Sequence, residues 1–205
     1  MSYTIFTTDS FIVKALPTRD ADVTLLLFTE QFGLLHAVAK SARQTKSKLR
    51  PALQSLSFSS ISLVKGREVW RVTSAKKHIS LHDKRLPIVY KSMFARMLLF
   101  IDRFCPRETA EAQVFANLKE ISGFIFKREA DKKTAGIANA DIIESIELLF
   151  ALKTLFELGY VTMIPEIEDC VKKTISEEII QSLEEPSLRK KVKQMIEKGM
   201  AESHL

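Results

Sequence analysis

The chain has 205 residues, of which 46% are hydrophobic, and its formal net charge is +6. This composition supports a packed core and excludes a disordered or collagen-like chain. Apolar runs such as residues 97–101 are too short to cross a bilayer, and residues 1–11 lack the basic and apolar regions of a secretory signal. We therefore expect a cytoplasmic protein that does not contact a membrane.

The excess positive charge lies in the N-terminal part of the chain. Residues 1–80 contain 12 Lys and Arg against 5 Asp and Glu, a net charge of +7, whereas residues 81–205 carry 19 and 20, a net charge of −1. A domain with this bias attracts polyanions, and nucleic acid is the commonest polyanion inside cells.

The first 80 residues have the pattern of a β-domain. Segments rich in β-branched and aromatic residues alternate with turn signals, and they predict strands over residues 10–16, 22–30, 34–42, 56–64 and 68–76. In the fourth segment the apolar period slips at Ser59 and Ser60, which predicts a β-bulge. Five short strands around a small core indicate a barrel.

Beyond residue 85 the apolar period becomes helical. Helices are predicted over 88–104 and 108–127, and a third helix, on which Ile142, Ile146, Leu149 and Phe156 form the buried stripe, should end at Gly159. Thr174 and Glu177 have capping-box spacing, and a basic helix is expected over 187–202 after Pro186. The fold class is therefore α+β, with a β-domain over 1–80 and an all-α domain over 81–205.

The sequence contains no motif of known enzyme chemistry. His78 and His82 lie four residues apart, but no CxxC pair accompanies them, so we interpret them as a solvated pair rather than zinc ligands. Cys105 and Cys170 form neither a disulfide framework nor a metal set. We expect a protein that is not an enzyme and holds no cofactor and no metal.

Two aromatic residues on the predicted strands have two possible roles. Trp70 and Phe58 could stack on unpaired bases, as strand aromatics of a barrel do. They could instead fill the core of a small barrel that is short of apolar volume. We favour core packing.

A basic stretch follows the third predicted strand and is the first candidate for a binding site. Residues 39–50, AKSARQTKSKLR, hold Lys40, Arg43, Lys46, Lys48 and Arg50 and no acidic residue. A run of charge is often only a solvated face. The hairpin that follows adds further cations, which could continue the same surface, so we predict that nucleic acid is bound by Lys40, Arg43, Lys46, Lys48, Arg50, Arg67, Arg71, Lys76 and Lys77.

The order of several short motifs resembles the RecO family of DNA repair proteins. The first is Phe28-Thr29, then Gly33, then Ala39-Lys40-Ser41-Ala42-Arg43 and the basic run; residues 152–160, LKTLFELGY, and Pro165 through Cys170 follow in the helical half. The resemblance implies an OB-fold barrel followed by a helical domain. It implies a recombination mediator that binds single- and double-stranded DNA, anneals complementary strands and works with RecR and the C-terminal tail of the single-strand-binding protein SSB to load RecA at the nucleoid.

The chain departs from the family pattern at two places. Ser41 stands where the pattern has glycine, which puts a turn with positive φ there in doubt. Only Cys170 remains of the four-cysteine zinc finger that many members carry, so we predict that the finger is lost.

Two other classes of function stay open at this point. One is an RNA-binding OB module, which would recognise 2′-hydroxyls and stack bases on aromatic side chains. The other is an adaptor whose basic loop docks an acidic protein.

Overall fold

The computed structural model describes residues 4–18, 21–81, 86–131 and 140–203. The chain divides into two compact units. The first consists of residues 1–84 with Cys105–Ala112, and the second consists of Arg85–Phe104 with Gln113–Leu205. We describe each unit separately.

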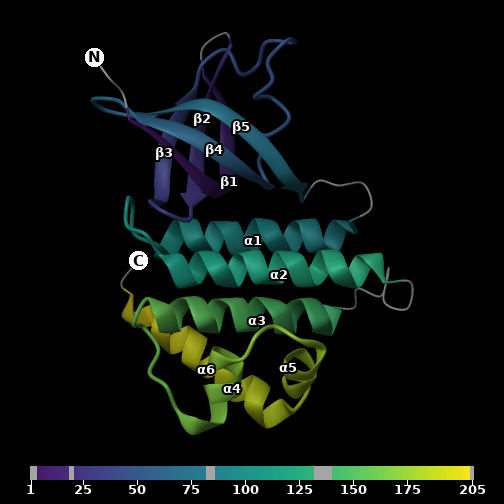
Figure 1. The fold of residues 1–205 in the computed structure, drawn as a ribbon. Helices are drawn as coiled ribbons and strands as arrows, with labels where there is room; N and C mark the ends of the chain where they lie inside the picture. The colour runs from purple at the N-terminus through teal and green to yellow at the C-terminus, as the bar shows by residue number, and fades with distance from the viewer. Residues whose placement is uncertain (1–3, 19–20, 82–85, 132–139, 204–205) are drawn as a thin grey trace. The chain divides into compact units, whose positions relative to one another are not determined.

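The first unit is a closed β-barrel. Its strands (Figure 1) follow one another around the barrel in the order β1-β2-β3-β5-β4, which is consistent with the OB-fold that the family resemblance implies. Neighbouring strands are antiparallel except for β3 and β5, which are parallel. The strands are β1 (Ile5–Thr18), β2 (Asp22–Thr29), β3 (Gly33–Ala39), β4 (Ser57–Lys65) and β5 (Trp70–Ser80).

The pairing of β1 with β4, in addition to its pairing with β2, closes the barrel. The first half of β1, from Ile5 to Phe11, pairs with β4, and its second half, from Ser10 to Thr18, pairs with β2. The register with β2 shifts between Ile12 and Lys14, which marks a β-bulge where the strand changes partner. The strand is therefore twice as long as the segment 10–16 that its composition predicts.

The sequence predicts a bulge on β4, but the extra residue lies on the neighbouring strand β5. β4 pairs with β1 without interruption from Phe58 to Val64. In the pairing of β4 with β5, the register shifts between Phe58 and Ser59, and His78 of β5 is the residue without a partner in the ladder. Alternation along β4 is regular, because Ser59 is buried on the same face as the core residue Ile61. The apolar period appeared to slip because a serine points inward and Phe58 points outward.

Trp70 and Phe58 are packing residues, as favoured from the sequence. Trp70 is 5% exposed and belongs to the barrel core, where its ring lies 5.0 Å from that of Phe32 and 5.9 Å from that of Phe6. Phe58 is 6% exposed, and its ring lies 4.7 Å from that of Phe11. Neither ring offers a free face to a base.

The segment between the first two helices belongs to the barrel unit. Gly33 has φ +63°, and a Cβ there would lie 1.7 Å from the carbonyl oxygen of Thr109, so only glycine fits this contact. Glu108 donates its backbone N–H to Leu34, and its carboxylate accepts from the Trp70 indole at 3.3 Å. These contacts explain why the second helix begins at residue 112 instead of the predicted 108.

The second unit is helical, with α3 at its centre. α3 contacts α1, α4, α5 and α6, and for this reason its buried residues cover most of its circumference instead of the single stripe predicted. On α1, the apolar residues that recur at helical spacing in the sequence are all buried: Tyr90, Phe94, Met97, Ile101 and Phe104. The elements are α1 (Ile88–Phe104), α2 (Ala112–Ala130), α3 (Ala140–Glu157), η1 (Pro165–Ile167), α4 (Glu168–Lys172), α5 (Glu177–Ser182) and α6 (Pro186–Glu202).

The predicted helix ends are partly confirmed. As predicted, α3 ends before Gly159, which has φ +80°. The N–H of Tyr160 donates back to the carbonyl oxygen of Leu155. The capping box at Thr174 is wrong, because the side chain of Ser176 caps α5 by accepting from the N–H of Ile179. Glu177 binds Arg128 instead.

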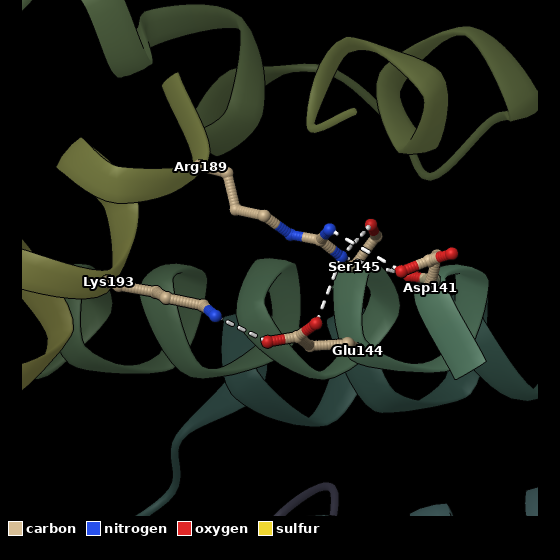
Figure 2. A network of polar contacts seen from close by, with 5 residues as sticks. All are labelled: Asp141, Glu144, Ser145, Arg189 and Lys193. Atoms are coloured by element: carbon tan, nitrogen blue, oxygen red, sulfur yellow. Dashed lines mark hydrogen bonds and ion pairs between the residues drawn. The ribbon is translucent and has the colours of Figure 1, made fainter. Parts of the chain in front are cut away.

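The basic residues of α6 are largely paired with acidic side chains. Figure 2 shows Arg189 reaching Glu144 at 3.1 Å and Asp141 at 3.7 Å, while Lys193 lies 2.5 Å from the other oxygen of Glu144. The hydrogen bond from Lys193 holds the pKa of the Glu144 carboxyl below its ordinary value. Lys191 likewise pairs with Glu166 at 2.5 Å. The charge of this helix fastens α6 to its surroundings and forms little free basic surface.

A buried lysine fastens the end of α4. Lys153 on α3 is 3% exposed, and its ammonium donates to the carbonyl oxygens of Val171 at 3.0 Å and Lys173 at 2.6 Å. Burial lowers the pKa of this amine, partly opposed by Glu120. The amine satisfies two carbonyl groups that the short helix leaves without a partner.

We predict that Lys153→Met lowers the free energy of unfolding by about 2 kcal/mol at neutral pH, because two buried carbonyls lose their donor. Since the amine has a lower pKa in the folded state, the unfolded chain binds protons more tightly, and the contribution of Lys153 to stability should rise with pH towards its ordinary pKa of 10.5. Urea denaturation at pH 7 and pH 9.5 measures both effects.

Lys198→Met is the matched control, because the Lys198 side chain is 78% exposed and pairs with Glu202 at 3.7 Å. An equal loss of stability in the two variants would contradict the role assigned to Lys153.

Candidate nucleic-acid interface

All of the basic residues predicted to bind nucleic acid are exposed, and they lie in two regions of the barrel unit. Lys40, Arg43, Lys46, Lys48 and Arg50 belong to the connection between β3 and β4, here called the basic segment (residues 40–56). Arg67, Arg71, Lys76 and Lys77 belong to the β4–β5 turn and to β5.

The basic segment is anchored at both ends. Near its start, the N–H of Arg43 donates to the carbonyl of Ala21 at 2.9 Å, just before β2. Near its end, the Ser55 hydroxyl accepts from the N–H of Ala15 at 3.1 Å, and Leu56 donates to Ile12 at 2.9 Å. The segment is therefore held against β1 and β2, although it contains neither a strand nor a helix.

Apolar residues inside the segment fix its middle. Ala42 is 1% exposed and Leu53 is 3% exposed, and both belong to the barrel core. Ala52 is also buried and its carbonyl accepts from the Ser59 hydroxyl at 2.8 Å. Because these small and apolar side chains point inward, the lysines and arginines between them are left at the surface.

The turn at Ser41 exists even though glycine is absent. Ser41 has φ +53°, so the left-handed conformation that the family pattern suggests is present and the doubt raised by the serine is settled. The carboxylate of Asp22 accepts from the Ser41 N–H at 2.8 Å, which holds the turn against the start of β2. This turn directs the chain from the end of β3 into the basic segment.

The basic segment contains no Asp or Glu. Among the residues that the structure describes, no ion pair is formed by Lys40, Lys46, Lys48 or Arg50. The contrast with α6 is clear, because there Arg189, Lys191 and Lys193 are matched by carboxylates. The basic segment is suited to bind an anionic partner from solution.

A groove of about 530 Å³ lies beside the basic segment. Apolar side chains lining it come from β1, β2 and the segment itself: Ala15, Pro17, Val23, Ala42 and Leu53. Its polar lining consists of Arg43, Arg50, Gln54 and Ser55. The groove thus brings together two of the predicted binding residues, and it adds Gln54 and Ser55, which the sequence pattern does not single out because their position depends on the anchoring to β1.

The cations of β5 lie at different places relative to the basic segment. Arg71 pairs with Val38 of β3, two residues before Lys40, so it lies beside the start of the segment. Lys76 pairs with Ser60, and Arg71 pairs with Val64 on the same face of β4, so Arg71 and Lys76 share a face. Lys77 follows Lys76 directly and points to the opposite face. Figure 1 shows the β4–β5 turn, which carries Arg67, on the other side of the barrel from the basic segment.

The structure gives no sign of a metal centre in the regions it describes. No group of three or more His, Cys, Asp or Glu is placed there to hold a metal ion. His78 lies 3.4 Å from the carboxylate of Asp9, whereas His82 lies outside the described residues. Cys105 and Cys170 are free and buried, and burial raises the pKa of the Cys105 thiol to about 12.

No helix in the described part of the chain is both long and apolar enough to span a membrane.

Comparison with known proteins gives consistent matches to one family. Residues 1–79 match the family model described as "Recombination protein O N terminal". A "DNA repair protein RecO" from Dehalococcoides mccartyi strain 195 is 32% identical over 110 residues, which cover 54% of this chain and 44% of that protein. A protein of the same name from Alkaliphilus metalliredigens is 25% identical, over 80% of this chain and 61% of that protein. Another from Clostridium novyi is 26% identical, over 76% of this chain and 57% of that protein. The chain matches about half of the length of these relatives.

We predict that Ser41→Val lowers the free energy of unfolding by about 1–2 kcal/mol, because a β-branched residue is strained at positive φ. Ser41→Gly should stay within about 0.5 kcal/mol of the parent, because relief of strain is offset by the greater freedom of glycine in the unfolded chain. Chemical denaturation measures both. Thr45→Val is the control at an exposed position of the same segment, and equal values for the two valine variants would contradict the assigned turn.

Proposed function

We propose that this chain, which is similar to the RecO family over its N-terminal unit and beyond, acts in DNA repair and recombination as a mediator that binds DNA and does not catalyse a reaction. The observation that carries the proposal is the basic segment, with five exposed cations, no acidic residue and anchors on β1 and β2. Lys40, Arg43, Lys46, Lys48 and Arg50 contact the phosphates of a DNA strand.

Phosphate contacts provide affinity without reading sequence. Each Lys or Arg that neutralises a phosphate releases condensed counterions, and this gain in entropy is largest at low salt. Contacts to the backbone leave the base edges free. A protein of this kind binds single- and double-stranded DNA alike in its basic segment, and its affinity falls steeply as salt rises.

Annealing follows from the same physics. Two complementary strands repel each other through their phosphates, and a scaffold of cations lowers that repulsion while the bases remain free to pair. Arg71 and Lys76, on one face of β5, offer further contacts for phosphates, beginning beside the start of the basic segment. A basic surface wider than one strand suits a protein that brings two strands together.

The helical unit serves as the docking platform for partner proteins, with RecR and SSB as the expected partners and RecA loading as the outcome. An apolar groove of about 230 Å³ between α1, α3 and α6 is lined by Met97, Phe100, Leu148 and Ile196. Arg96, Glu144 and Glu147 lie at the same groove, and Arg96 pairs with Glu147 at 2.6 Å. A tail with an apolar end, such as that of SSB, would place its apolar residues in the groove, and a carboxylate of the tail would replace Glu147 at Arg96.

The burial of Trp70 and Phe58 weighs against the RNA-binding alternative, which relies on aromatic rings that stack on bases. The adaptor alternative requires that the basic segment does not bind DNA at moderate salt.

We predict that Lys40→Gln/Lys46→Gln/Lys48→Gln weakens binding to single-stranded DNA and lowers the slope of log K against log salt by about 2, since each lost phosphate contact removes about 0.7. Fluorescence anisotropy with a labelled oligodeoxynucleotide across a salt series measures the slope. Matched RNA and duplex DNA are measured in parallel.

The control is Lys172→Gln/Lys190→Gln/Lys198→Gln, which removes the same charge from exposed positions of the helical unit. If the control variant loses as much slope as the first variant, binding is a response to net charge alone. Tighter binding to RNA than to DNA would favour the RNA-binding alternative.

A further inference from the structure

The groove beside the basic segment has walls that are fixed on both sides. On one side, Arg43 is tied to Ala21 and the Ser41 turn is tied to Asp22. On the other side, Ser55 is tied to the N–H of Ala15 next to the bulge of β1. A groove with fixed walls binds a ligand without first paying the entropy of ordering a loop.

The lining of the groove combines three kinds of group. Its floor is apolar, formed by residues such as Val23 and Leu53, and its volume of about 530 Å³ is in the range of small-molecule sites. Two guanidinium groups, from Arg43 and Arg50, lie in the same lining, and among the described residues that line the groove none carries a carboxylate. The amide of Gln54 can both donate and accept hydrogen bonds.

A nucleotide with an unpaired base can contact all three kinds of group: the apolar floor, the guanidinium groups and the amide. The base is flat and largely apolar on its faces, so it fits an apolar floor, and a guanidinium plane stacks on it. A side-chain amide can form paired hydrogen bonds with a base edge. A free phosphate or an acidic peptide would use the arginines but would leave the apolar floor uncovered.

We propose that this groove holds an unpaired nucleobase of the DNA strand whose phosphates lie on the basic segment. The proposal rests on the proposed function and deepens it, because it gives the chain a means to distinguish single strands from duplex. A base inside a duplex is stacked and paired, and it must be released from both contacts before it enters a groove. The lysines and arginines of the basic segment provide affinity for any DNA, and the groove adds affinity for a single strand only.

The test uses Arg50→Gln/Gln54→Ala, which removes one guanidinium and the amide from the groove. Both residues are exposed, so the fold should be unaffected, and circular dichroism verifies this. The matched control is Lys48→Gln/Gln44→Ala, which removes the same charge and the same amide from exposed positions of the same segment that do not line the groove. Affinities are measured for an oligodeoxynucleotide of about 12 nucleotides, for the same strand with abasic residues, and for the duplex.

We expect the groove variant to bind the normal single strand about tenfold more weakly than the control variant does. On duplex and on the abasic strand the two variants should bind equally. With 2-aminopurine in the single strand, the parent chain should change the fluorescence of the base and the groove variant should not.

If the groove variant loses affinity equally for the normal strand, the abasic strand and the duplex, Arg50 is only a phosphate contact. That result would overturn the proposal. So would a groove variant that binds the normal strand as well as the control does. In both cases the proposed function stands if removal of Lys40, Lys46 and Lys48 still lowers the salt slope. Absence of DNA binding by the parent chain at low salt would overturn both.

Discussion

The pairing of β1 with two neighbouring strands is the constraint on which the rest of the barrel depends. Ser10 and Phe11 pair with β2 on one side and with β4 on the other, and the bulge that follows lets the strand continue along β2 alone. Because β1 pairs with both β2 and β4, neither of those strands is left as a free edge beside it. The same bulge presents the N–H of Ala15 to Ser55.

The basic segment derives its place from this arrangement. It connects β3 to β4 without strand or helix, and it would be free to move if its ends were not fastened to β1 and β2. Buried Ala42 and Leu53 bring it into the barrel core at two points. Its lysines and arginines therefore stay exposed on a fixed backbone, whereas the cations of α6 are matched with carboxylates and serve to hold the helices together.

Much of this structure follows from local pattern. The α1 stripe and the glycine after α3 were predictable because helix periodicity and left-handed turns depend on near neighbours in the chain. The first half of β1, the inward serine on β4 and the later start of α2 were not, because each depends on contacts distant in sequence.

The binding residues divide in the same way. A charge run without acids is visible in the sequence, so Lys40 through Arg50 could be predicted as a group. The groove could not, because Pro17, Val23 and Gln54 meet only after the barrel closes. The separation of the β4–β5 turn from the basic segment also follows from topology and not from the spacing of cations along the chain.

The central claim is that DNA lies on the basic segment, and lysine footprinting tests it most directly. The chain is acetylated briefly with and without a single-stranded oligodeoxynucleotide, and modification at each lysine is quantified by mass spectrometry. The account predicts that DNA protects Lys40, Lys46 and Lys48 while Lys190 and Lys198 react as before. Unchanged reaction at the three lysines of the basic segment, or equal protection on α6, would contradict it.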